Sequence, residues 1–147
     1  MKGLLTLIYL ILPIVVMAQI KVDVPFKMLP ETECIEEDKK NSNEVVLIFR
    51  DKITGDTLNN YQFGVSYFEC DLHYAFEHSG FGIISTDSFL LKRNKVAGYN
   101  KNKDRLYGYF SMPNYIGYGH RFLIPRNCKK IIVWVCSRDV LYRKQNQ

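Results

Sequence analysis

Residues 44–70 read EVVLIFRDKITGDTLNNYQFGVSYFEC, and this stretch decides the predicted fold class. Residues 45–49 form an unbroken apolar run rich in β-branched side chains, which predicts a buried strand. Residues 51–56 have the composition of a turn, in which Gly55 can adopt a positive φ. Residues 61–68 alternate between two faces, interrupted only at their last residue, as is typical of a half-buried strand. The stretch therefore predicts a β-hairpin at the core of an all-β domain.

Length and composition indicate one folded domain. The chain has 147 residues, of which 47% are hydrophobic and 14% are aromatic, mostly tyrosine and phenylalanine. This apolar content can supply a core, and the aromatic residues favour strands over helices. The formal net charge is +5 and the isoelectric point is near 9.0. We interpret this charge as a solvated cationic surface and expect no nucleic-acid partner.

The N-terminal residues have the pattern of a secretory signal peptide. Lys2 is followed by a mostly apolar segment at residues 4–17, and Ala18 ends a Val-Met-Ala sequence that suits signal peptidase. The segment is shorter than the roughly 20 apolar residues that a membrane span needs. We therefore expect residues 1–18 to be removed and residues 19–147 to form one periplasmic or extracellular domain without a stable membrane span. An uncleaved anchor is the alternative.

Four cysteines, Cys34, Cys70, Cys128 and Cys136, lie in the predicted mature chain. An even number fits two disulfides in an oxidising compartment. Residues 129–135 are predicted to be a single strand, which would hold the last two cysteines about 26 Å apart at roughly 3.3 Å per residue. A disulfide needs Cα atoms within about 7 Å, so the pair Cys128–Cys136 is disfavoured, and with it Cys34–Cys70. The pairings 34–128 with 70–136 and 34–136 with 70–128 both remain.

The segments on either side of the predicted hairpin add short strands and loops. Residues 20–24 alternate and predict an edge strand, whereas residues 27–43 are polar and predict a loop, with a short helical turn as the alternative for part of it. Residues 71–80 are predicted to be a connection, and residues 81–91 a third strand. Residues 92–105 are basic and rich in asparagine, and we expect an exposed loop there.

The C-terminal third contains further strand signals. Residues 106–124 carry tyrosines separated by glycines around Pro113 and Asn114, which predicts a second hairpin. Residues 129–136 read KKIIVWVC and predict a central strand whose Trp134 packs against the core. The whole pattern predicts an antiparallel β-sandwich of about seven strands with no helix.

The turn of the first predicted hairpin resembles that of a known family. Asp51, Thr54, Gly55 and Leu58 match the D-x-x-T-G-x-x-L turn of carboxypeptidase-regulatory-like domains. Residues 84–89 are loosely similar to a later turn of these domains but lack its glycine. The resemblance implies an immunoglobulin-like or prealbumin-like sandwich with a structural or binding role in an exported bacterial protein. The cysteines and the tyrosine-rich segment do not belong to the family pattern.

Four tyrosines are the preferred candidates for a binding site. Tyr107, Tyr109, Tyr115 and Tyr118 offer flat apolar faces with polar tips, which suit contacts with a protein or a glycan. The alternative is that these tyrosines pack against one another on a sheet. We predict that they form the binding surface of a non-enzymatic exported module.

A second set of candidates consists of His73, Glu77 and His78, with Asp71 beside them. Their spacing differs from the H-E-x-x-H motif of zinc hydrolases, and the sequence contains no G-x-S-x-G motif. We interpret the histidines as surface residues and predict no catalytic residue, no bound metal and no cofactor. A small secreted metal-dependent hydrolase that uses His73 and His78 is the alternative.

Overall fold

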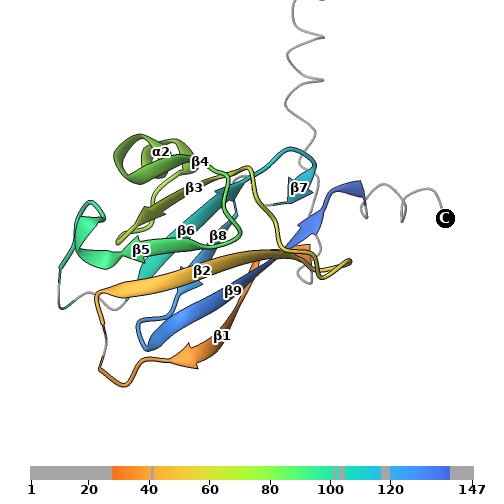
Figure 1. Cartoon of the computed structure of the whole chain (residues 1–147). Coiled ribbons are helices and arrows are strands. Elements are labelled where there is room, and N and C mark those ends of the chain that lie inside the picture. The colour runs from red at the N-terminus through yellow and green to blue at the C-terminus, as the bar shows by residue number, and fades with distance from the viewer. Residues whose placement is uncertain (1–27, 41, 101, 103–104, 117–119, 140–147) are drawn as a thin grey trace, which may run out of the picture.

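The computed structural model describes residues 28–40, 42–100, 102, 105–116 and 120–139, which form two packed β-sheets (Figure 1). The predicted all-β sandwich is confirmed, with nine strands instead of about seven and with one α-helix in the described ranges. Residues 1–18, the predicted signal peptide, and residues 20–24, the predicted edge strand, lie outside them. None of the helices within these ranges is long and apolar enough to cross a membrane.

The first sheet, sheet A, has the strand order β1–β9–β2–β5. Its strands are β1 (Glu31–Glu37), β2 (Glu44–Asp51), β5 (Phe89–Lys92) and β9 (Cys128–Ser137). Strand β9 pairs antiparallel with β1 and parallel with β2, and β2 pairs antiparallel with β5. The short strand β7 (Tyr115–Ile116) pairs with the end of β9. The prediction of a central strand near the C-terminus is thus confirmed.

The second sheet, sheet B, has the order β4–β3–β6–β8 and is antiparallel throughout. Its strands are β4 (Gly80–Ile84), β3 (Tyr61–Ser66), β6 (Leu106–Ser111) and β8 (Arg121–Ile124). Helix α2 (Leu72–Ser79) lies on the face of sheet B that points away from sheet A (Figure 1). Gly64 allows this close approach, because a Cβ there would lie 3.3 Å from the backbone of Ala75.

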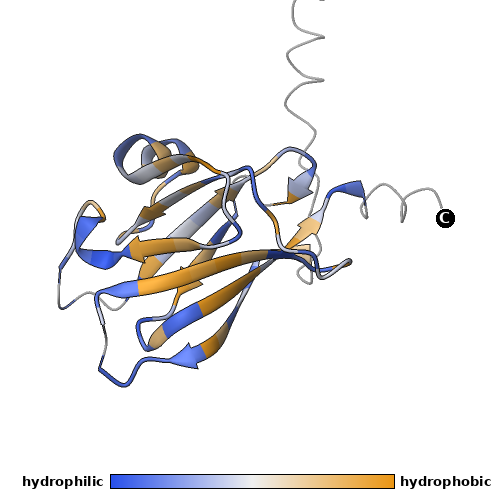
Figure 2. Ribbon diagram, viewed as in Figure 1, coloured by the Kyte–Doolittle hydropathy of each residue, from blue (hydrophilic) through white to orange (hydrophobic). Residues whose placement is uncertain are grey.

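The core lies between the two sheets. Val45, Leu47 and Phe49 on β2 and Phe63 on β3 are completely buried there. The ring of Phe49 lies 4.5 Å from that of Tyr61, measured between centroids. Hydrophobic residues fill the middle of β2 and of β9, with polar residues toward the ends of both strands (Figure 2). Burial of these apolar faces is the main favourable contribution to folding.

The predicted hairpin of residues 44–70 is wrong, although both of its strands exist. Strands β2 and β3 lie in different sheets, and the connection between them crosses from one layer to the other. The turn itself is as predicted: Gly55 has a φ of 76°, and the Asp51 carboxylate accepts hydrogen bonds from the backbone N–H groups of Ile53 and Thr54. Because β9 and β5 flank β2 in sheet A, β2 has no edge left for β3.

Two other segments contain regular structure where loops were predicted. Residues 27–43 contain β1, an acidic and largely exposed strand that is held by backbone pairing with β9 and has no hydrophobic period. Residues 71–80 contain α2, whose N-cap Asp71 accepts a hydrogen bond of 2.7 Å from the Tyr74 backbone N–H. An Asp at the N-cap satisfies one of the unpaired donors of the first turn. With eight residues, the helix is too short to show a clear period in the sequence.

The later strand predictions are partly correct. Residues 81–91 contain two strands, β4 and β5, that belong to different sheets. Strands β6 and β8 pair as the second predicted hairpin requires, but the Pro113–Asn114 turn leads into β7 instead of directly into β8. Trp134 faces outward instead of packing against the core, and its Nε1 donates a hydrogen bond of 2.8 Å to Glu33.

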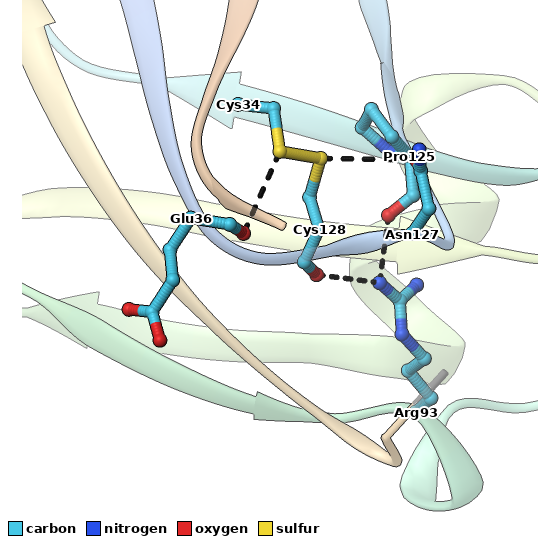
Figure 3. Close-up of a disulfide and its surroundings, with 6 residues drawn as sticks. All are labelled: Cys34, Glu36, Arg93, Pro125, Asn127 and Cys128. Atoms are coloured by element: carbon cyan, nitrogen blue, oxygen red, sulfur yellow. Dashed lines mark hydrogen bonds between the residues drawn. A yellow bond between two sulfur atoms is a disulfide. The ribbon is translucent and has the colours of Figure 1, made fainter. Parts of the chain in front are cut away.

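The predicted exposed loop at residues 92–105 is anchored at its start, and part of it lies outside the described residues. Arg93 is buried and donates hydrogen bonds to the carbonyls of Pro125 at 2.8 Å and Cys128 at 3.5 Å (Figure 3). Val96 belongs to the hydrophobic core. The prediction of an exposed loop is therefore wrong for these two residues.

One disulfide joins Cys34 of β1 to Cys128 of β9, with the Cα atoms 5.8 Å apart (Figure 3). This is one of the pairs that the sequence left open, but the second pair, Cys70–Cys136, does not form. Cys70 packs beside Tyr109 on the outer face of sheet B, whereas Cys136 is buried against Met28 near the end of β9 in sheet A. The two thiols thus belong to different layers of the sandwich.

We expect loss of this disulfide to destabilise the protein strongly. The bond closes a loop with a sequence separation of 94, so the Cys34→Ser/Cys128→Ser variant should lose about 4.6 kcal/mol of unfolding free energy in the chain-entropy model. Urea unfolding measures the loss. Cys70→Ser is the matched control and should unfold at nearly the wild-type urea concentration. Equal midpoints for the double variant and the wild type would contradict the prediction.

Candidate functional site

The structure places Tyr107 and Tyr109 underneath helix α2. Both are buried on the outer face of sheet B, where they pack against Leu72 and Ala75. Tyr109 is only 2% exposed, and its hydroxyl donates a hydrogen bond of 2.9 Å to the Cys70 carbonyl. Burial, together with the neighbouring Cys70 side chain, raises the pKa of Tyr109 to about 12. These two tyrosines therefore hold the helix on the sheet.

Tyr115 lies in a different environment and Tyr118 lies outside the described residues. The half-buried Tyr115 belongs to β7, which pairs with sheet A, and its hydroxyl donates a hydrogen bond of 2.7 Å to Asp51. Burial and this carboxylate raise the pKa of Tyr115 to about 12. The structure does not bring Tyr107, Tyr109 and Tyr115 together on one exposed surface. A binding role for the four tyrosines stays a prediction.

The second set of candidate residues lies on α2. His73, Glu77 and His78 are exposed, and Asp71 is occupied as the N-cap. The ring of His78 stacks on that of Tyr74 at 3.9 Å between centroids. Among the residues that the structure describes, no three His, Cys, Asp or Glu side chains are placed to hold a metal ion.

A different group of aromatic rings is exposed beside α2. We call Phe68, Tyr74, His78 and Tyr99 the aromatic surface. Phe68 is 37% exposed, Tyr74 37% and Tyr99 41%. The rings of Phe68 and Tyr74 lie 5.2 Å apart at an interplanar angle of 62°. Three of these four residues thus expose a large part of an apolar ring to solvent.

Three separate segments position the aromatic surface. Phe68 follows the end of β3, Tyr74 and His78 lie on α2, and Tyr99 follows the short 3-10 helix η2 (Arg93–Lys95). The loop that carries Tyr99 is fixed to the helix, because the Ala97 backbone N–H donates a hydrogen bond of 3.0 Å to the Ser79 hydroxyl. The surface is therefore built before any ligand binds.

Packing beneath the aromatic surface fixes it further. The Tyr99 ring packs edge-on against that of the buried Tyr67, with centroids 5.8 Å apart. Gly98 lies against the Phe68 ring. Its φ of 78° is a backbone conformation that residues with a side chain rarely adopt. At the rim, Arg121 forms an ion pair of 3.0 Å with Glu69. The site thus combines rigid apolar rings with polar tips and a charged edge.

The sequence contained one signal for this surface. Phe68 is the residue that interrupts the alternation of residues 61–68. It lies two residues beyond the end of β3 and is partly exposed. Tyr74 and His78 are four residues apart and so share a helix face, but this pairing has meaning only once α2 is known. The approach of Tyr99 depends on the tertiary fold.

The Asp51 carboxylate makes the stability of the fold depend on pH. Burial raises the pKa of Asp51, but hydrogen bonds from Tyr115 and from the N–H groups of Ile53 and Thr54 outweigh it, so the pKa lies below its ordinary value of 3.8. The ionised form therefore stabilises the fold above about pH 4, and this contribution is lost as the pH falls through the lowered pKa. We expect Asp51→Asn to cost about 2 kcal/mol at neutral pH.

The measurement is urea unfolding as a function of pH. The Asp51→Asn variant should also lose less stability than the wild type between neutral and strongly acidic pH, since it has no carboxylate to protonate. Asp56→Asn is the matched control, because the Asp56 side chain is exposed. Parallel pH profiles for Asp51→Asn and the wild type would contradict this account.

We expect Tyr109→Ala to loosen α2. Removing a buried aromatic ring typically costs about 3 kcal/mol, whereas Tyr109→Phe keeps the ring and should cost only about 1 kcal/mol through the lost hydrogen bond. Hydrogen exchange should accelerate across Leu72–Ser79 in the Ala variant and change little in the Phe variant. Unchanged exchange in the Ala variant would show that Tyr109 does not support the helix.

The chain matches no protein-family model, no curated protein and no solved structure. The resemblance to carboxypeptidase-regulatory-like domains therefore stays a prediction from the residues of its turn.

Proposed function

We propose that this protein is an exported, non-enzymatic module that binds a protein partner through its aromatic surface. The observation that carries the proposal is the cluster of three partly exposed rings, Phe68, Tyr74 and Tyr99, held in place by a helix and two anchored loops. Aromatic residues are enriched in protein interfaces, where a few rigid rings contribute most of the binding energy. Rings that are already fixed lose little conformational entropy on binding.

The ring geometry favours a protein over a glycan. The exposed rings of Phe68 and Tyr74 are inclined to each other by 62°. A sugar chain stacks best on rings that share a plane, whereas inclined rings form a contoured surface that can receive protruding side chains. Shape complementarity of this kind is typical of protein interfaces.

Two further observations support export and a structural or binding role. A disulfide such as Cys34–Cys128 persists in oxidising compartments, which fits an exported protein. The likeness of the turn at residues 51–58 to that of carboxypeptidase-regulatory-like domains is in line with a structural or binding role. The alternative hydrolase gains no support from the histidines, because His78 packs on Tyr74 and its Nδ1 lies 3.0 Å from the Tyr74 carbonyl.

The test compares the wild type with a Phe68→Ala/Tyr74→Ala/Tyr99→Ala variant as bait for exported proteins of the native host. We expect a partner that the wild type retains and the triple variant loses, with direct titration showing at least about thirtyfold weaker binding, the effect of one hot-spot residue or more. Ile53→Ala/Leu90→Ala is the control, because these exposed apolar residues lie elsewhere.

Identical partners for the wild type and the triple variant would contradict the proposal. Specific binding to a glycan array that the triple variant loses would show that the surface is correct but the ligand class is wrong. Circular dichroism of each variant verifies that the fold is kept.

A further inference from the structure

Helix α2 covers only part of the outer face of sheet B, and a groove of about 440 Å³ lies on the part left open. Ile83, Gln62 and Ser111 form one row across β4, β3 and β6 in the strand register. These residues line the groove, and Ile83 is 70% exposed. The groove is next to the start of β3, whereas Phe68 of the aromatic surface follows its end. The two sites therefore lie at opposite ends of sheet B.

A rigid turn forms one wall of the groove. The Tyr115 backbone N–H donates a hydrogen bond of 3.2 Å to the Met112 carbonyl, and Asn114 has a φ of 66°. This is the pattern of a type II turn, which favours Pro at its second position and a residue such as Asn at its third. Arg138, the residue after β9, holds the turn in place. Its backbone N–H donates a hydrogen bond of 2.7 Å to the Asn114 carbonyl, and its Nε donates one of 3.1 Å to the Tyr115 carbonyl.

The polar groups of the groove are available to a ligand. Within the described part of the chain, the side chains of Gln62, Ser111 and Asn114 form no hydrogen bond, and the terminal NH₂ groups of Arg138 form none. Among the lining residues that the structure describes, Arg138 is the one cation and there is no carboxylate. Side-chain amides both donate and accept hydrogen bonds, as a peptide backbone does. The charge and the donors of the groove are thus complementary to a carboxylate attached to a chain of amide groups.

We propose that this groove binds the carboxyl-terminal end of an extended peptide. The Arg138 guanidinium receives the terminal carboxylate, because its two NH₂ groups can form paired hydrogen bonds with the two carboxylate oxygens. Gln62 and Asn114 pair with backbone amides of the peptide. The apolar surfaces of Ile83 and Met112 receive its last side chain. None of the described lining residues is aromatic, which disfavours a sugar acid as the occupant.

The test uses an N-terminally fluorescein-labelled pentapeptide of glycine, serine and alanine that ends in leucine, prepared with a free carboxylate or as its amide. Fluorescence anisotropy with the purified protein should show saturable binding of the acid and about tenfold or weaker binding of the amide, as expected for loss of one charged hydrogen-bonded contact. Arg138→Gln should remove the difference between the two peptides. The control Arg105→Gln, in an exposed arginine at the other end of β6, should leave it intact.

A second variant keeps the test decisive if Arg138→Gln fails to fold. Gln62→Ala/Ser111→Ala removes two groups that make no hydrogen bond in the described residues, so the fold should remain while affinity for the acid falls about tenfold. Equal affinity for acid and amide, no binding of the acid, or binding of a labelled oligogalacturonate in place of the peptide would each overturn the proposal. The Phe68→Ala/Tyr74→Ala/Tyr99→Ala variant should bind the peptide normally, because the two sites are separate.

Discussion

The packing of Phe49 between the two sheets is the interaction on which the rest of the structure depends. Its ring, on β2 of sheet A, contacts the rings of Tyr61, Phe63 and Phe110 on sheet B at centroid distances from 4.5 to 5.6 Å. This contact requires β2 and β3 to face each other across the core instead of pairing edge to edge. Strand β2 then satisfies its backbone hydrogen bonds with β9 and β5. Sheet A is mixed, because β2 runs parallel to β9 and antiparallel to β5.

The same arrangement determines which surfaces are left for binding. Sheet B turns one face to Phe49 and the other outward, and the outward face is too apolar at Tyr107 and Tyr109 to remain uncovered. Helix α2 covers these tyrosines and carries Tyr74 and His78, two residues of the aromatic surface at one end of the sheet. Its eight residues are too few to reach the row of Gln62, which stays open as the groove. Because Tyr107 and Tyr109 are used to hold α2 on the sheet, the proposed binding surfaces are formed by other residues.

The sequence predicts features that depend on local chemistry. The apolar run of β2, the positive φ of Gly55 and the central position of β9 follow from residue patterns over a few positions. Features that depend on pairing over long distances are not predictable in this way. Strand β1 is acidic and exposed, so only its pairing with β9 reveals it as a strand. Alternation at Tyr107 and Tyr109 identified a strand face but not the helix that covers it.

Solution NMR of the protein can determine directly which strand lies beside β2. We expect nuclear Overhauser contacts between backbone protons of Phe49 and its parallel partner Val133, together with contacts between the Phe49 ring and those of Tyr61 and Phe110. Backbone contacts between β2 and β3 in an antiparallel register, with none between Phe49 and Val133, would show a hairpin within one sheet and contradict the account.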